Sequence, residues 1–266
     1  DQDPAIMVDI QRTKGCQVIA IQASTKTATA IYLCRDLNQP PRLVMPLKDG
    51  IVYHLDVGDN DDVYILVSDG NEQSGTNNRS FGLELSLWET TVDSLPTGAD
   101  LDLSLGRLVS GAQEGFVITD MDIFRDFVAL YERSTNNGTQ RLRLLRKRGS
   151  SLVSDDESII VPFTSPNEQC AVLSPAGNMH YKATSVRFVV DSPSCPGKTY
   201  EYDVLAKKMR MLSNPSEHLN NHNIRQKRVM VTSKDGTQVP LSLIYSEKSS
   251  SASETRYAVL LGYGSY

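Results

Sequence analysis

The chain has 266 residues, a formal net charge of −5, and 39% hydrophobic residues against 22% charged ones. A chain of this length can form one large domain or two ordinary ones around a substantial hydrophobic core. The negative charge argues against nucleic acid or an anionic membrane surface as a partner, because both attract clustered lysine and arginine. No apolar stretch of the sequence approaches the roughly 20 residues that a membrane helix needs.

The two ends of the sequence and its cysteines indicate whether the chain is part of a longer protein and whether its thiols are reduced. It begins with Asp1 instead of a methionine and stops where the apolar run "VLLG" turns into "YGSY", so we expect both ends to continue in a longer protein. Its four cysteines are Cys16, Cys34, Cys170 and Cys195. They show no CxxC spacing, which argues against a zinc site and favours reduced thiols in a cytoplasmic protein. A Cys16–Cys34 bridge between neighbouring strands stays open.

The first 213 residues are a succession of short β-branched and aromatic runs separated by turn signals, with almost no helical periodicity. The runs fall into groups of four that begin near Ala5, Gly50, Gly115 and Gln169. This pattern predicts four antiparallel meanders, spaced somewhat above the roughly 40–50 residues of a propeller blade. We interpret them as four blades of a β-propeller, while a sandwich of hairpins is the alternative that strand alternation leaves open.

The third group contains a basic run, "RLRLLRKRG", at residues 141–149. Such a run can mark a nucleic-acid site, but it stands in a chain of negative net charge. Its alternation of basic and apolar residues predicts a strand with one solvated basic face.

The composition changes after residue 213. Residues 214–227 are polar, contain Pro215 and lack any period, which predicts an interdomain linker. From residue 228, "RVMVTS" and "QVPLSLIYS" flank the turn "KDGT", whose Asp-Gly pair favours a hairpin. A serine-rich loop then leads to a third apolar run, "RYAVLLGYG", and the three runs predict strands of a new sheet.

No complete catalytic motif occurs in the chain. The nucleophile pentapeptide GxSxG and the phosphate-binding GxxxxGK[ST] are both absent. No histidine and carboxylate recur at helical spacing, so no metal and no cofactor are expected. The histidines are His54, His180, His218 and His222. No motif places any of them beside a serine and an aspartate, and we interpret them as structural or solvated.

The last ten residues, "YAVLLGYGSY", follow two predicted strands. In α/β-hydrolases, one donor to the oxyanion comes from the loop after the third strand. Gly262 and Gly264 would let the backbone approach a substrate closely, and Tyr263 between them carries a hydroxyl donor. A plain strand-ending turn is the alternative interpretation.

These residues resemble the entry into the peptidase domain of the prolyl oligopeptidase family. "RVMVTSKDGTQVPLSLIY" and "YAVLLGYGSY" stand in the family's order and at about its spacing, and the ending is closest to the oligopeptidase B branch. Upstream, "DIFRDFVALYERSTNNGTQRLRLL" and "SVRFVVDSPSCPGKTYEYDVLAKKM" resemble propeller stretches of the family more weakly. Leu261 departs from the pattern, since many members have tyrosine there.

The resemblance implies a mostly β fold. Residues 1–213 would be the C-terminal part of a propeller lid, 214–227 the linker, and 228–266 the first strands of an α/β-hydrolase domain. In this family a seven-bladed propeller caps a peptidase domain with a Ser-Asp-His triad and admits only short peptides. The tyrosine at the place of Tyr263 donates to the oxyanion, within the loop of Gly262 and Gly264.

The triad would lie beyond Tyr266, so the resemblance implies a fragment of a serine peptidase that is inactive alone. Its substrates in the parent enzyme would be short peptides, cut after basic residues in the oligopeptidase B branch. A different class of protein remains as an alternative, a non-catalytic four-bladed propeller that binds a partner. The surplus strands from residue 228 onward argue against it, because an unpaired apolar edge promotes aggregation.

Overall fold

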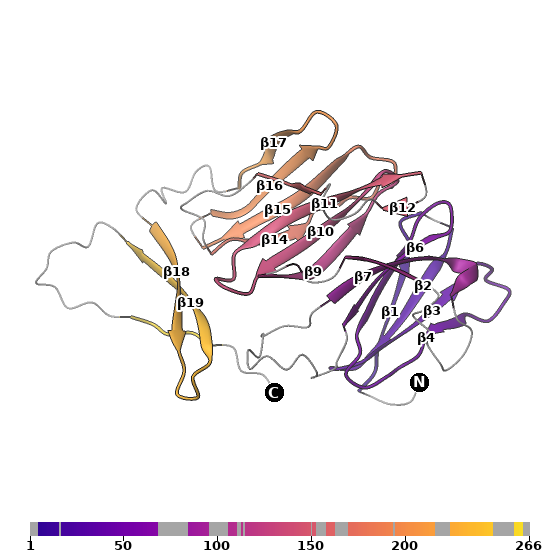
Figure 1. The fold of residues 1–266 in the computed structure, drawn as a ribbon, viewed down its shortest axis with the longest axis horizontal. Helices are drawn as coiled ribbons and strands as arrows, with labels where there is room; N and C mark the ends of the chain where they lie inside the picture. The colour runs from indigo at the N-terminus through magenta and orange to yellow at the C-terminus, as the bar shows by residue number, and fades with distance from the viewer. Residues whose placement is uncertain are drawn as a thin grey trace, which may run out of the picture.

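The computed structural model describes residues 5–15, 17–68, 85–95, 106–110, 113, 115–149, 151–152, 158–162, 170–193, 195–215, 224–246 and 258–262. Antiparallel strands make up almost all of its regular structure, together with one short 3-10 helix, η1 (Val92–Ser94). Within these ranges no helix has the length and apolar character to cross a membrane. Figure 1 shows the strands as successive sheets followed by a separate hairpin.

The first and fourth groups of strands each form a four-stranded meander in chain order. The first, blade 1, consists of β1 (Met7–Arg12), β2 (Ile19–Ser24), β3 (Thr29–Cys34) and β4 (Arg42–Met45). The fourth, blade 4, consists of β14 (Val172–Pro175), β15 (Ser185–Ser192), β16 (Cys195–Asp203) and β17 (Lys208–Ser213). Cys34 is a buried free thiol, so it forms no bridge to Cys16.

The second and third groups form blades 2 and 3, which are joined into one nine-stranded sheet. Blade 2 consists of β5 (Tyr53–Val57), β6 (Asp62–Ser68), β7 (Leu85–Thr91) and β8 (Arg107–Ser110). Blade 3 consists of β9 (Phe116–Ile123), β10 (Phe127–Ser134) and β11 (Gln140–Arg148), with the short β12 (Ser151–Leu152) and β13 (Ile159–Ile160) on β11. The blades join where Leu85 of β7 pairs with Ile118 of β9. The prediction of four antiparallel meanders is therefore confirmed.

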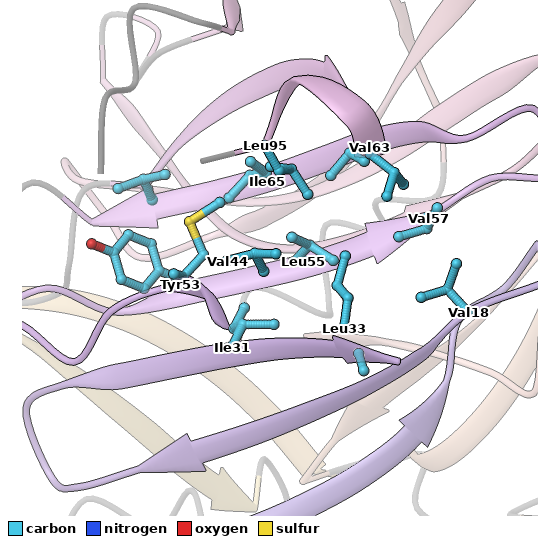
Figure 2. Close-up of a cluster of buried hydrophobic side chains, with 14 residues drawn as sticks. Val18, Ile31, Leu33, Val44, Tyr53, Leu55, Val57, Val63, Ile65 and Leu95 are labelled. Carbon is cyan, nitrogen blue, oxygen red and sulfur yellow. The ribbon is translucent and has the colours of Figure 1, made fainter. Parts of the chain in front are cut away.

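The blades pack face to face in chain order, because the side chains of each inner sheet are apolar on both faces. On β6, Val63 and Ile65 belong to the core that blade 2 shares with blade 1, whereas Tyr64 and Leu66 belong to the core shared with blade 3. Figure 2 shows the first of these cores, in which Leu33 and the other side chains of blade 1 meet those of blade 2. A third core joins blades 3 and 4. This succession is the packing of a β-propeller, of which the chain forms four blades.

The predicted solvated basic face of residues 141–149 is wrong, although the predicted strand is present as β11. Arg143 is fully buried, and the side chain of Arg141 is only 19% exposed. Both donate to the carboxylate of Glu132 on β10, with Nε–Oε distances of 2.7 Å from Arg143 and 2.5 Å from Arg141. Arg143 also donates to the Ser110 hydroxyl of blade 2 at 2.9 Å. The basic residues are buried because a carboxylate on the adjacent strand compensates their charge.

Beyond blade 4, β18 (Ile224–Thr232) and β19 (Gln238–Ser246) form a two-stranded hairpin. Its turn places Gly236 at a positive φ of 86°, a conformation that glycine adopts without steric cost. β18 begins at Ile224, four residues before the expected domain start at 228. The Gln226 side-chain amide donates to the Ser192 hydroxyl at 3.2 Å and so joins the hairpin to blade 4.

The expected third strand after the hairpin is absent from residues 258–262, which have no regular secondary structure. Val259, Leu260 and Leu261 are 86%, 82% and 88% exposed. A strand needs a hydrogen-bonded neighbour, and no strand among the described residues pairs with this segment. The strand prediction is wrong for this part of the chain.

Candidate functional site

The predicted oxyanion loop is only partly covered by the structure. Gly262 is exposed, and a Cβ added there would meet no atom within 4 Å. Tyr263 and Gly264 lie outside the described residues. The role of all three residues in an oxyanion site therefore stays a prediction.

The described residues gather polar groups at another place, where the first strands of the four blades end. Lys14 follows β1, Asp56 is on β5, Asp122 is on β9 and Asn178 follows β14; we call these four residues the four-blade cluster. Because residues from all four blades meet here, the first strands lie nearest the axis around which the blades are arranged. The axis of a propeller is its central channel.

The four-blade cluster is held by short polar contacts. The Lys14 ammonium forms an ion pair with the Asp122 carboxylate. The Asn178 amide donates to the other oxygen of Asp122 at 2.6 Å. The Lys14 backbone N–H donates to Asp56 Oδ1 at 2.9 Å. A single lysine therefore connects blade 1 to blade 2 through its backbone and to blade 3 through its side chain.

Burial dominates the electrostatics of the four-blade cluster. It lowers the pKa of Lys14, while the nearby Asp122 opposes that shift. Burial also raises the pKa of Asp56, against the hydrogen bonds that its carboxylate accepts from the N–H groups of Lys14 and Val57. The Lys14 ammonium lies 3.6 Å from the centre of the Phe124 ring, a favourable place for a desolvated cation. The cluster is a compact, largely dry joint between blades.

A second polar pair lies farther back along the same first strands. His54 Nε2 on β5 is 3.9 Å from Asp120 Oδ1 on β9, and the two side chains are 44% and 41% exposed. Burial raises the pKa of Asp120, and the charge of His54 opposes the shift. The exposure of His54 agrees with its interpretation as a solvated residue; His180 is exposed as well, while His218 and His222 lie outside the described residues. Among the residues with a described position, no three His, Cys, Asp or Glu side chains are arranged to hold a metal ion.

Neither the four-blade cluster nor the His54–Asp120 pair was predicted from the sequence, although a signal for both is present there. In "YHLDV" and "ITDMDI", polar residues alternate with apolar ones on strands that were predicted correctly. The apolar members, such as Leu55 and Met121, belong to the cores between blades. The polar members of these strands lie outside the cores. Only the register of four separate strands brings them together, and that register is not readable from one sequence.

Loop packing beside the four-blade cluster depends on two glycines. A Cβ added to Gly15 would lie 2.2 Å from the carbonyl carbon of Gly58, and one added to Gly58 would lie 2.3 Å from the hydroxyl of Tyr181. The Tyr181 hydroxyl in turn accepts a hydrogen bond from the Lys147 ammonium at 3.1 Å. Loops of blades 1, 2 and 4 are thus in direct contact with one another, and the blade 4 loop contacts the end of β11 in blade 3.

Gly15→Ala should destabilise the protein, because a methyl group there overlaps backbone atoms that cannot rotate away. Overpacking of this kind typically costs about 1–3 kcal/mol. Urea denaturation followed by circular dichroism would measure the loss. Gly262→Ala is the matched control, since its methyl group meets open space. Equal stability of the two variants would contradict the described packing.

Comparisons with known proteins extend this description. No family model matches the chain. It is 25% identical, over 268 residues, to a prolyl endopeptidase-like protein of Xenopus laevis, covering 100% of this chain and 34% of the relative. A prolyl endopeptidase-like protein of Gallus gallus is 25% identical over 252 residues, covering 94% and 30%. The chain thus spans about a third of the length of these curated relatives.

The fold of the chain is also similar to that of a solved structure of the same kind of protein. Oligopeptidase B from Trypanosoma brucei, in a closed form with covalently bound antipain, superposes on this chain with a TM-score of 0.72 at 19% identity. The match covers 93% of this chain and 33% of the oligopeptidase. In sequence and in fold, the chain is similar to proteins of the prolyl oligopeptidase type. Its four blades and hairpin correspond to about a third of a prolyl oligopeptidase-type protein, in agreement with the resemblance seen in the sequence.

Proposed function

We propose that this chain is part of a serine peptidase of the oligopeptidase B type that hydrolyses short peptides. The observation that carries the proposal is the extent of the matches. They run through the blades and the hairpin together and cover 93% or more of the chain. A protein related only by its propeller would match the blades and leave the hairpin unmatched.

In this proposal the two parts of the chain have different roles. Blades 1 to 4 form part of the wall of a channel that restricts access to the catalytic centre. The hairpin and the following residues begin the domain that performs acyl transfer. Tyr263 donates its hydroxyl to the oxyanion, while Gly262 and Gly264 let the backbone approach the substrate. The serine, aspartate and histidine of the triad come from residues outside this chain.

Acyl transfer explains why a tyrosine hydroxyl is useful at this place. The serine oxygen attacks the peptide carbonyl, and negative charge develops on the carbonyl oxygen as the tetrahedral intermediate forms. A fixed hydroxyl donor stabilises that charge more than it stabilises the neutral carbonyl of the substrate, so it lowers the barrier.

The proposal is tested with the full-length protein that carries this chain. We expect it to hydrolyse short reporter peptides with arginine, lysine or proline before the scissile bond, and a serine-directed covalent inhibitor should abolish that activity. The 266-residue chain alone should give no turnover, because no motif in it supplies a nucleophile. The reporters that are cut define the cleavage specificity.

Two outcomes would contradict the proposal. A full-length protein that is folded but hydrolyses none of the reporters would favour the alternative, a propeller that only binds a partner. Inhibitor-sensitive turnover by a contaminant-free preparation of the chain alone would show that the chemistry lies within it.

A further inference from the structure

His54 and Asp120, on the first strands of blades 2 and 3, lie opposite each other without being hydrogen-bonded. The 3.9 Å between His54 Nε2 and Asp120 Oδ1 exceeds the range of a hydrogen bond. A histidine also attracts a carboxylate electrostatically only while it is protonated. The pair therefore adds little to the joint between the two blades, in contrast to the buried ion pair of Lys14 and Asp122.

The pair is accessible, whereas the polar contacts near it are closed. The side chains of His54 and Asp120 are 44% and 41% exposed. Those of Lys14 and Asp122 are 9% and 12% exposed, and the two charges compensate each other. Asp56 is held by hydrogen bonds from two backbone N–H groups. Among the described residues, Asp120 thus keeps an accessible carboxylate that no ammonium or guanidinium group compensates.

A β-bulge in β9 fixes the Asp120 carboxylate. Tyr131 of β10 pairs with Asp120, while the next residue of β10 pairs with Ile118, so Thr119 is an extra residue in β9. The Thr119 hydroxyl donates to the Tyr131 carbonyl at 3.1 Å. Asp120 Oδ1 accepts from the Met121 N–H at 2.8 Å, and no donor among the described residues bonds to Oδ2. Bulges often redirect side chains beside functional sites, and this one leaves an oriented carboxylate with a free acceptor.

Two neighbouring acceptors suit a ligand that has several donors and a positive charge. An uncharged imidazole offers one ring nitrogen as an acceptor, and an ionised carboxylate offers acceptors only. A guanidinium has five N–H donors in a planar fork, so it can donate to both groups at once. An ammonium has three donors and can do the same. An anionic ligand would be repelled by the Asp120 carboxylate.

We propose that His54 and Asp120 form a binding site for the guanidinium or ammonium group of a basic side chain in a bound peptide. This inference rests on the proposed peptidase function and adds to it a specificity-determining contact from the blades. Asp120 supplies the negative charge, and His54 supplies the second acceptor from the neighbouring blade. Both residues are on first strands, which in a propeller surround the central channel.

Asp120→Asn tests the site in the full-length protein, because asparagine keeps the size of the side chain and removes its charge. The protein is first treated with a serine-directed covalent inhibitor, so that bound peptides are not cut. Fluorescence anisotropy at about pH 8 then gives Kd for a labelled peptide of about ten residues with one arginine, and for the same peptide with citrulline, the uncharged analogue of arginine. We expect the parent to bind the arginine peptide about fivefold more tightly, as is typical of one partly exposed charge pair, and Asp120→Asn to reduce the ratio to about one.

Asp9→Asn is the matched control. Asp9 is exposed on β1, the first strand of blade 1, and its Oδ1 accepts from the Ile10 N–H at 2.9 Å, the same local bond that Asp120 makes. The substitution removes one negative charge without changing the His54–Asp120 pair, so it should keep the parent's ratio of the two Kd values. Equal losses in the two variants would assign the effect to net charge and overturn the site.

His54→Lys is a second test that does not require Asp120→Asn to fold. A lysine at this half-exposed position places its own ammonium beside Asp120 and competes with the peptide, so the preference for arginine should be lost. Either folded variant with the parent's Kd ratio would overturn the site, and so would a parent that binds both peptides equally. Hydrolysis without the inhibitor is measured separately. A parent that prefers the arginine peptide but cleaves no reporter would contradict the proposed function and support the site.

Discussion

Tyr263→Phe in the proposed full-length peptidase should lower kcat by about 10²–10³-fold, or roughly 3–4 kcal/mol of transition-state stabilisation. The substitution keeps the aromatic ring and deletes only the hydroxyl. Because the proposed role of the hydroxyl is to stabilise the oxyanion and not the bound substrate, KM should stay within about twofold of the parent. Folding should be unaffected. Steady-state kinetics with the best short reporter peptide, together with a thermal melt, measure both quantities.

Tyr245→Phe is the control for this prediction. Tyr245 is at the end of β19 and is 47% exposed, so removal of its hydroxyl should change neither kcat nor KM appreciably. If Tyr263→Phe keeps kcat within about twofold of the parent, the tyrosine fills an ordinary turn and is removed from the proposed active site.

Glu132→Ala should lower the free energy of unfolding by about 3–5 kcal/mol, the usual cost of removing one partner from a buried ion pair. Glu132 is 1% exposed and accepts hydrogen bonds from both Arg141 and Arg143. Without the carboxylate, the fully buried Arg143 guanidinium keeps the Ser110 hydroxyl as a hydrogen-bond partner but loses the negative charge that compensates it. Urea denaturation at neutral pH measures the loss.

Blade 4 offers a control with the same arrangement at the surface. Glu201 accepts hydrogen bonds from Arg187 and Arg210, but the side chains of these arginines are 51% and 70% exposed. Water screens such pairs, and they typically contribute about 0–1 kcal/mol. Glu201→Ala should therefore cost far less than Glu132→Ala. Similar losses from the two substitutions would show that burial is not the cause.

The strands could be predicted from the sequence because each run carries its own alternation and its own turn signals. β6 and β11 show how far this information extends. The alternation of β6 sends Val63 and Ile65 to one core and Tyr64 to another, and both faces are apolar in the sequence. The alternation of β11 is equally clear, yet the burial of Arg143 depends on Glu132 and Ser110. Those partners are 11 and 33 residues away, and no local sequence pattern predicts that they pair with Arg143.

The candidate sites also differ in whether they depend on local sequence or on residues far apart in the chain. The Gly262–Gly264 loop could be proposed from sequence because its chemistry is local and its motif is short. The four-blade cluster could not, since Lys14 and Asp122 are 108 residues apart and meet only through the stacking of whole blades. The prediction of a third strand at residues 258–262 is wrong for a related reason. An apolar run supplies strand propensity, but a strand also needs a neighbouring sheet edge with which to pair.

The junction of β7 with β9 makes blades 2 and 3 one hydrogen-bonded sheet, and this sheet carries a core on each of its outer faces as well as one between its two blades. Blades 1 and 4 each share only one of these cores. Stability within the chain is therefore uneven, since opening either outer blade disrupts one core, whereas opening an inner blade disrupts two. Local unfolding begins at the least protected units. In the isolated 266-residue chain, we therefore expect local opening first in blades 1 and 4 and last in the sheet of blades 2 and 3.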